Sequence, residues 1–438
     1  MDKKELRKLS KRELLLLITE QQEQRIQFLE EENRILKEKL AKLEQLLKAF
    51  DNPHTPSSKV RSKKNTERDE STARFPGKPE GSKGAGIQMP APDQEVEVKK
   101  DSCPDCGDKL GNPYNHYTFR QMDIPQPQFV TTQYHVALYH CSCGAEIDAG
   151  SDLQQGFYGP NTTAFLGSLR TECLSYEAIS RLLKETYKLK ISNVAVFNKL
   201  TMIASLMSSE RELIRKAIND GDAANMDETG LRKDGKNGQV WNASTAEYCL
   251  FEYDRSRGAD VAKRILNSFA GILTTDDFKS YYWYELRQLC WAHLLREAKE
   301  FAEKYSEAKI QYERLKVLYN KSKLVQEMQD VSKYDALAVE LEDIATCYHP
   351  MDGCRIMYGK IHNRTALWLR AVKYPLAQLT NNRTERNLRK VVLHRNRMGC
   401  IRNEKGEAFV NNFLTCTSTW QIQGKNTYEK LLTYAKLT

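Results

Sequence analysis

The chain has 438 residues, 40% of them hydrophobic, so it is long enough to bury a large core and to hold two or three modules. Its 67 basic and 58 acidic residues give a formal charge of +9, and a basic excess of this size favours a polyanionic partner such as nucleic acid. The start of the chain lacks a signal-peptide pattern and no apolar run approaches a membrane span, so we expect a cytoplasmic protein without membrane contacts.

The first predicted element is a coiled coil within residues 1–50. A heptad frame fills the core positions with Ile26, Asn33, Leu40 and Leu47 at a and with Leu29, Leu36 and Leu43 at d. In a parallel dimer the g and e′ positions pair residues of opposite sign, namely Arg25 with Glu30, Glu32 with Lys37, and Lys39 with Glu44. The single polar core residue, Asn33, favours one register, so the pattern predicts a parallel homodimer or a higher oligomer. The alternative is an amphipathic helix that packs on its own protein.

Residues 51–100 are rich in Pro, Gly, Ser and Lys and contain almost no apolar clusters. Such a segment buries too little apolar surface to offset its ordering entropy, so the composition predicts a flexible linker. Its basic run of Lys59, Arg61, Lys63 and Lys64 suits contact with phosphates, or equally a solvated charge cluster.

Four of the eleven cysteines form two tight pairs in a predicted zinc-binding domain at residues 101–150. The pairs flank a strand-like span at residues 117–139 and are Cys103 with Cys106 and Cys141 with Cys143. Four thiolates in a reducing cytosol fit a tetrahedral Zn²⁺ site better than a disulfide framework. The second pair has the tighter Cys-x-Cys spacing, so His140 or His135 could replace one sulfur. Reduced structural cysteines are the alternative.

Two helices joined by a short turn are predicted within residues 151–221. The first covers residues 174–187, and the second covers residues 194–206 after Ser192, which can cap it. In a helix-turn-helix the start of the second helix meets base edges, so Asn193, Asn198 and Lys199 are predicted to bind DNA. A helical hairpin without DNA contacts is the alternative.

Three acidic residues mark the region 222–400. Asp227 lies on a predicted strand at residues 223–230, which is followed by two alternating segments, at residues 239–246 and 248–253, that are typical of hairpin strands. A helix is predicted at residues 255–269, and Asp276 follows a short buried strand at residues 271–275. Glu385 lies in the first turns of a helix that opens near Asn381, a residue type that can cap it. Carboxylates from separate elements, together with substrate phosphate, hold Mg²⁺ or Mn²⁺ in catalytic sites. A solvated turn is the alternative for Asp276.

The sequence around Glu385 is strongly basic, and the residues between Asp276 and Glu385 are charged and helical. The basic residues are Arg386, Arg389, Lys390, Arg395, Arg397 and Arg402. Such density beside a carboxylate suits a phosphate-bearing substrate, and a solvated helix face is the alternative. Residues 294–375 are predicted to form a helical insertion, and residues 401–438 a C-terminal helical region.

Four stretches, taken together and in this order, resemble a known family. They are MDETG at residues 226–230, LTTDDFKSY at 273–281, CWAHLLRE at 290–297 and NNRTERNLRKVVLHRNR at 381–397. They resemble the catalytic domain of the insertion-sequence-sixty-six family of DDE transposases, and the similarity runs through most of the chain. The sequence departs from that pattern at Asp277, where the family usually has Gly, and at Thr380, where it often has Asp.

The resemblance implies an α/β RNase H-like catalytic domain at residues 222–400, in which Asp227, Asp276 and Glu385 bind magnesium, after a zinc-binding module. Cys290 and His293 match a Cys-x-x-His signature that follows the second acid in several DDE families, with either a structural role or a DNA-positioning or proton role. We therefore expect a multidomain chain with a coiled coil, a linker, a zinc-binding domain, a helix-turn-helix, the catalytic domain with its insertion, and C-terminal helices.

The leading hypothesis is a nucleoid-associated transposase that binds double-stranded DNA at the ends of its element and joins them to target DNA, with element-encoded accessory proteins as further partners. Cleavage and strand transfer are both in-line phosphoryl transfers. One competing hypothesis is an RNase H-like nuclease that lacks strand transfer. The other is a dimeric zinc-containing DNA-binding regulator whose acids no longer turn over, and the presence of all three acids argues against it.

Overall fold

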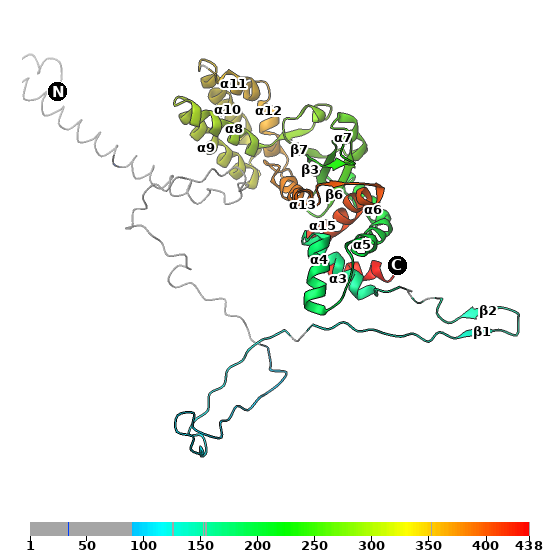
Figure 1. Cartoon of the computed structure of the whole chain (residues 1–438). Coiled ribbons are helices and arrows are strands. Elements are labelled where there is room, and N and C mark those ends of the chain that lie inside the picture. Colours follow the sequence, from blue (N-terminus) through cyan, green and yellow to red (C-terminus); the bar gives the residue numbers. More distant parts are fainter. Residues whose placement is uncertain are drawn as a thin grey trace, which may run out of the picture. The chain divides into compact units, whose positions relative to one another are not determined.

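A computed structural model describes Arg34 and residues 90–124, 127–151, 153, 156–351 and 353–437. The chain divides into two compact units, Met1–Gln121 and Met122–Thr438. Apart from Arg34, the predicted coiled coil lies outside the described residues, and so does the linker as far as residue 89. The sheet and the helices that surround it all belong to the second unit (Figure 1).

The span predicted as strand-like, residues 117–139, has a strand only at its end. There β1 (Leu138–His140) pairs antiparallel with β2 (Glu146–Asp148), and the side chains of both strands are exposed. The other described residues of the span have no regular structure. A β-ladder needs a partner strand and an apolar face to bury, and within this span only Leu138 and Tyr139 have a partner strand. The prediction is therefore wrong over most of the span.

Four helices precede the sheet, and two of them are the helices of the predicted helix-turn-helix. In chain order they are α3 (Pro160–Thr171), α4 (Tyr176–Tyr187), α5 (Asn193–Leu206) and α6 (Ser208–Asn219). Ser175 caps α4 by accepting from the backbone N–H of Ala178 at 3.1 Å. Ser192 caps α5 in the same way from Ala195, also at 3.1 Å, as the sequence predicted.

A five-stranded mixed sheet follows, with the strand order β6-β5-β3-β7-β8. Its strands are β3 (Ala223–Gly230), β5 (Gln239–Ser244), β6 (Cys249–Asp254), β7 (Ile272–Thr275) and β8 (Arg287–Leu289). β3, β5 and β6 form an antiparallel meander, whereas β7 and β8 run parallel to β3. The predicted strands at residues 223–230, 239–246, 248–253 and 271–275 correspond to β3, β5, β6 and β7.

The helix predicted at residues 255–269 is shorter than expected, because α7 covers only Ala259–Ile265. A polar turn precedes it, in which Asp254 accepts from the N–H of Ser256 at 2.7 Å and the Ser256 hydroxyl accepts from the N–H of Gly258 at 2.9 Å. These side chains satisfy backbone donors outside a helix, which is the usual way that Asp and Ser delay helix formation.

Helices fill the interval between β8 and the third acid. They are α8 (Trp291–Lys304), α9 (Ala308–Glu327), α10 (Tyr334–Tyr348), α11 (Arg355–His362) and α12 (Thr365–Trp368), with 3-10 turns η3 (Val331–Lys333) and η4 (Arg370–Lys373). Their apolar side chains form a second core that includes Ile272 and Leu289 of the sheet. The helices gather beside β7 in Figure 1, so the predicted insertion is a helical layer joined to one edge of the sheet.

The chain ends by covering the other edge of the sheet. After α13 (Asn382–Met398), the strand β9 (Cys400–Ile401) pairs with β4 (Arg232–Lys233), and four helical segments follow, namely α14 (Glu404–Ala408), the π-helix η5 (Phe409–Phe413), α15 (Leu414–Ile422) and α16 (Thr427–Ala435). Three side chains spaced by four residues accept hydrogen bonds from the outward N–H groups of edge strand β6. They are Asn411, Thr415 and Thr419, at 2.7, 2.8 and 3.1 Å respectively. This protects an edge that would otherwise pair with other chains.

Candidate active site

The register of two parallel strands brings the first two predicted acids together. Ala223 of β3 lies opposite Ile272 of β7, and Asn225 lies opposite Thr274. Two residues further along each strand, this register brings Asp227 level with Asp276, which directly follows β7. Residues two apart share a face, and neighbouring strands lie about 4.8 Å apart. The two carboxylates are therefore neighbours on one face of the sheet.

Both aspartates lie where a negative charge is costly. Burial, and then the charge of Asp276, raise the pKa of Asp227 well above its usual range, and Glu228 and Glu385 add to this effect. Burial raises the pKa of Asp276 to about 6, with the charge of Glu228 as the next cause. Within the described residues neither aspartate forms an ion pair. Two crowded carboxylates without a paired cation are a typical sign of a functional site.

Helix α13 carries the third acid and is fixed to β3 by the residue before it. Asn381 donates from Nδ2 to the backbone oxygen of Met226 at 2.8 Å and accepts from Nδ2 of Asn225 at 3.2 Å. The sequence predicted a capping role for this asparagine, but its side chain makes no capping bond and joins the helix to the strand of Asp227 instead. Glu385 lies in the first turn of α13. Asn381 thus sets the position of the third acid relative to the first.

The Cys-x-x-His signature supports the same junction. The thiol of Cys290 is buried and accepts from the backbone N–H of Asn381 at 3.0 Å, and burial raises its pKa to about 12. His293, one turn into α8, has Nε2 3.8 Å from Oε1 of Glu385, and burial lowers its pKa. Of the two roles left open by the sequence, the structural one fits Cys290, because its sulfur holds the start of α13. His293 instead faces Glu385, the third predicted acid.

A fourth acid, which the sequence analysis did not single out, lies beside the first. The side chain of Glu228 is only 1% exposed and pairs with Arg257, whose Nη2 is 2.7 Å from Oε1. Its other oxygen accepts from the hydroxyl of Tyr281 at 2.6 Å. The sequence did contain a signal for this acid. Glu228 follows another acid in a strand whose neighbouring residues are buried, and a buried acid requires a partner. The sequence did not identify Arg257 as that partner, because the two residues lie on different elements and meet only when the chain packs.

The adjacent acid Asp277, at the position where Gly is usual, points to a different partner. It forms an ion pair with Arg364, just before α12, and accepts from the hydroxyl of Tyr282 at 3.1 Å. The guanidinium carbon of Arg364 also lies over the ring of Tyr282, 5.4 Å from the ring centroid. Asp277 therefore attaches the loop after β7 to the insertion through Arg364.

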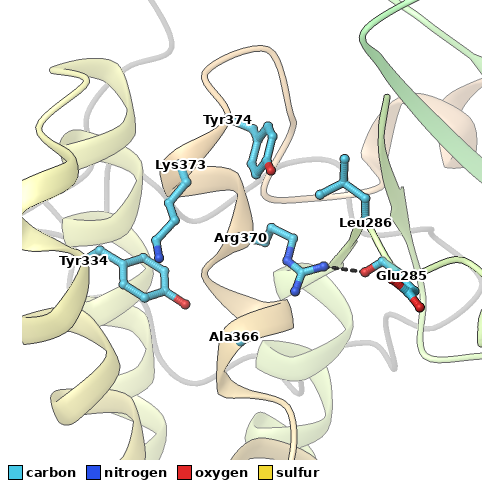
Figure 2. A pocket seen from close by; sticks show the side chains of 7 residues that line it. All are labelled: Glu285, Leu286, Tyr334, Ala366, Arg370, Lys373 and Tyr374. Atoms are coloured by element: carbon cyan, nitrogen blue, oxygen red, sulfur yellow. Dashed lines mark hydrogen bonds between the residues drawn. The ribbon is translucent and has the colours of Figure 1, made fainter. Parts of the chain in front are cut away.

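A second charged region, the basic hollow, lies between the start of β8 and the insertion. It has a volume of about 400 Å³ and is lined by Glu285, Leu286, Tyr334, Ala366, Arg370, Lys373 and Tyr374. Figure 2 shows Arg370 directed toward Glu285, whose backbone oxygen it contacts, and Lys373 ending over Tyr334, 3.6 Å from the ring centroid. Within the described residues neither cation pairs with a carboxylate. The predicted sites did not include this hollow.

The residues predicted to read DNA on α5 lie where they can reach a partner. Asn193 and Asn198 are exposed, and Lys199 is half-buried. Asn193 is the first residue of the helix, immediately after the Ser192 cap. This arrangement agrees with the prediction, which stays a prediction.

The basic residues of α13 divide into two groups. Arg386 and Arg389 are exposed. Lys390 donates to the Ser418 hydroxyl at 3.1 Å, and burial lowers its pKa. Arg395 and Arg397 donate to backbone oxygens, those of Gly230 and Cys173 respectively. The first group is exposed to solvent, whereas the second group holds the helix in place.

The two cysteine pairs have matching local geometry. In each, the first thiol accepts from the backbone N–H of the second cysteine, and this lowers the pKa of Cys103 and of Cys141. A turn closed by a left-handed glycine follows each pair, Gly107 with φ +81° and Gly144 with φ +89°. Cys103 and Cys106 belong to the first unit, and Cys141 and Cys143 belong to the second. The four-sulfur zinc site stays a prediction.

The three predicted acids offer the donors that a hard cation requires. Asp227, Asp276 and Glu385 supply carboxylate oxygens, which Mg²⁺ and Mn²⁺ prefer. Burial first, and then neighbouring negative charge, raise the pKa values of both aspartates, and a bound cation would offset both effects. Across the described ranges, no three His, Cys, Asp or Glu side chains are close enough to hold one ion together as they stand. Glu385 is directed instead toward His293 and Arg296, each 3.8 Å away.

A mixed sheet with adjoining carboxylates from β3, β7 and a packed helix fits the class of nucleic-acid-processing enzymes to which transposases belong. The model of the Transposase IS66 family matches residues 155–408, more than half of the chain, and the chain belongs to this family. No curated protein matches the sequence. None of the helices in the described ranges combines the length and the apolar character needed to cross a bilayer.

Proposed function

We propose that this transposase cuts double-stranded DNA at the ends of its element and joins the freed ends to target DNA, with Asp227, Asp276 and Glu385 as its catalytic acids. The observation that supports the proposal is the register of β3 and β7, which, continued by two residues, brings together two half-buried aspartates that have no ion-pair partner among the described residues. The strand order, with an antiparallel meander extended by two parallel strands, also suits the RNase H-like fold that the family resemblance implies.

The three acids would hold Mg²⁺ or Mn²⁺. When bound, such ions supply positive charge to the attacking and leaving oxygens of an in-line phosphoryl transfer, so no protein nucleophile is needed. The sheet fixes the two aspartates, and the bond from Asn381 to Met226 fixes the helix of Glu385. Glu385 must leave the neighbourhood of His293 and Arg296 to join them, so these two residues compete with the ions for its carboxylate.

DNA would approach this face through residues that are already exposed. Asn193 and Asn198 at α5 and Arg386 and Arg389 at α13 are the side chains that we expect to contact it. The zinc-binding domain and the coiled-coil dimer remain parts of the proposal as the sequence predicts them. Binding of element ends by a dimer would allow both ends to be held at once.

The test separates chemistry from binding. Asp276→Asn removes a ligand charge with almost no change in shape, so Mg²⁺-dependent nicking of a duplex that carries the element's ends should fall at least about 100-fold. Binding of the same duplex in a gel-shift should persist, because the DNA contacts lie elsewhere. Asp227→Asn and Glu385→Gln should behave alike.

Asp254→Asn is the matched control, because Asp254 also ends a strand of the sheet but pairs with Arg264, 2.7 Å away. It should nick at close to the wild-type rate. Nicking by Asp276→Asn at the wild-type rate would refute the assignment of the acids. A wild-type protein that nicks but yields no joined product would be a nuclease, and one that only binds would be a regulator.

A further inference from the structure

We infer that Arg257 is a catalytic residue that contacts the DNA phosphate at the acids, and that Glu228 is a positioning residue that holds Arg257 there. The inference rests on the proposed function, since it names a further group of the same site. Arg257 lies in the loop between β6 and α7, far in sequence from the three acids and outside the four stretches that resemble the family.

The carboxylate of Glu228 is fully occupied by protein groups. Its Oε1 receives both Nε and Nη2 of Arg257, at 2.8 and 2.7 Å, and its Oε2 receives the Tyr281 hydroxyl at 2.6 Å. With both oxygens used and its side chain 1% exposed, Glu228 is poorly suited to bind a metal ion. A buried carboxylate strongly favours its bonded cation, so Glu228 fixes one edge of the Arg257 guanidinium.

Arg257 is held at two further points. Its guanidinium carbon lies 3.9 Å from the centroid of the Phe278 ring, and its backbone oxygen accepts from the Ser280 hydroxyl at 2.6 Å. The backbone N–H of Phe278 in turn donates to Oδ1 of Asp276 at 3.1 Å. One residue, Phe278, therefore supports both Asp276 and Arg257. This places the guanidinium beside the second catalytic acid.

Part of the guanidinium remains free to act on a ligand. The Arg257 side chain is 52% exposed although it pairs with a buried acid. Glu228 engages Nε and Nη2, whereas a guanidinium has five N–H donors in a planar fork. A fixed, half-exposed arginine beside crowded carboxylates suits a phosphate that must come close to those acids.

The first test measures nicking of the element-end duplex by the full-length protein. Arg257→Ala should lower the rate about 100-fold or more while folding is kept, because a preorganised donor to transition-state charge is lost. Arg264→Ala is the matched control, since Arg264 is 51% exposed and also pairs with acids of the sheet. It should nick like wild type. Added methylguanidinium should restore part of the rate to Arg257→Ala and none to Asp276→Asn.

Glu228→Gln tests the positioning role. It should slow nicking less than Arg257→Ala, and the double variant should be no slower than Arg257→Ala alone, because both changes remove one function. Wild-type nicking by Arg257→Ala, in a preparation where Asp276→Asn is inactive, would overturn the inference and leave the proposed function intact. Additive losses in the double variant would overturn the role of Glu228.

A second measurement does not require cleavage. With Ca²⁺ in place of Mg²⁺, the affinity for the duplex is measured against salt concentration. Loss of one phosphate contact should reduce the slope of log affinity against log salt by about 0.9 in Arg257→Ala, and by nothing in Arg264→Ala. Equal slopes for wild type and Arg257→Ala would also overturn the inference, whatever the outcome for nicking.

Discussion

The acids on β3, β7 and α13 and the basic hollow beside β8 handle charge in opposite ways. Asp227 and Asp276 are crowded, and after burial the charge of Asp276 is the largest cause that raises the pKa of Asp227. In the hollow, Arg370 and Lys373 have a backbone oxygen and an aromatic ring as partners. In each region one sign of charge lacks its counter-ion within the described residues. Burial is the largest cause of the raised pKa of both aspartates, so the acids store unfavourable free energy in the fold, whereas Lys373 is exposed and solvated and stores little.

The largest expected effect comes from separating α13 from β3. Asn381→Ala removes the bonds to Met226 and Asn225 and leaves buried groups without partners, which should lower the free energy of unfolding by about 2–4 kcal/mol. Nicking should fall by roughly 100-fold, because Glu385 loses its position. Chemical denaturation and the nicking assay measure the two effects.

Asn426→Ala is the control for that change, since Asn426 is a true cap and accepts from the N–H of Glu429 at 3.3 Å. It should cost about 1 kcal/mol and leave nicking unchanged. If Asn381→Ala were no more harmful than Asn426→Ala, the junction would not be what positions the third acid.

The next effect is a gain in stability when a crowded acid is neutralised. The pKa of Asp276 is raised from 3.8 to about 6. Between these two values the folded protein therefore binds more protons than the unfolded chain. The free energy of unfolding falls as pH rises through this window, by about 3 kcal/mol at most. In Asp276→Asn this fall in the free energy of unfolding is absent, because the amide does not ionise. In chelator at pH 7.5 its free energy of unfolding should exceed that of wild type by roughly 2 kcal/mol.

The same experiment has an internal check. At pH 4 the advantage of Asp276→Asn should largely disappear, because Asp276 is then mostly protonated in the folded protein. Saturating Mg²⁺ should raise the melting temperature of wild type more than that of the variant. A variant less stable than wild type at pH 7.5 would contradict the view that the site is electrostatically strained.

The smallest effect is expected in the basic hollow. Lys373→Ala removes an exposed cation without a carboxylate partner and should change the free energy of unfolding by less than about 0.5 kcal/mol. Gln326→Ala is the contrast, because its Nε2 donates to the backbone oxygens of Ala371 and Ala377 at 2.9 and 2.8 Å and holds this segment. It should cost about 1–3 kcal/mol. A large loss for Lys373→Ala would erase the difference between the two regions.

The sequence by itself determined the local elements and singled out the three acids that we propose as catalytic. Alternation and capping residues predicted β3, β5 and β6 and the start of α5 after Ser192, because these depend on neighbours within a few residues. The acids and the Cys-x-x-His signature were recognisable from short stretches. The strand-like prediction at residues 117–139 was wrong over most of its length, because a strand depends on a partner that no local pattern specifies.

Only the tertiary structure decided how those residues meet. The register of β3 on β7 brings Asp227 level with Asp276, although 49 positions separate them, as between Asn225 and Thr274. Asn381 serves as a junction instead of a cap because β3 offers it a backbone oxygen. Arg257 reaches Glu228 from a loop that the sequence predicted as the start of a helix. Such contacts join residues distant in sequence, and their free energy arises only when the chain packs, so no local pattern encodes them.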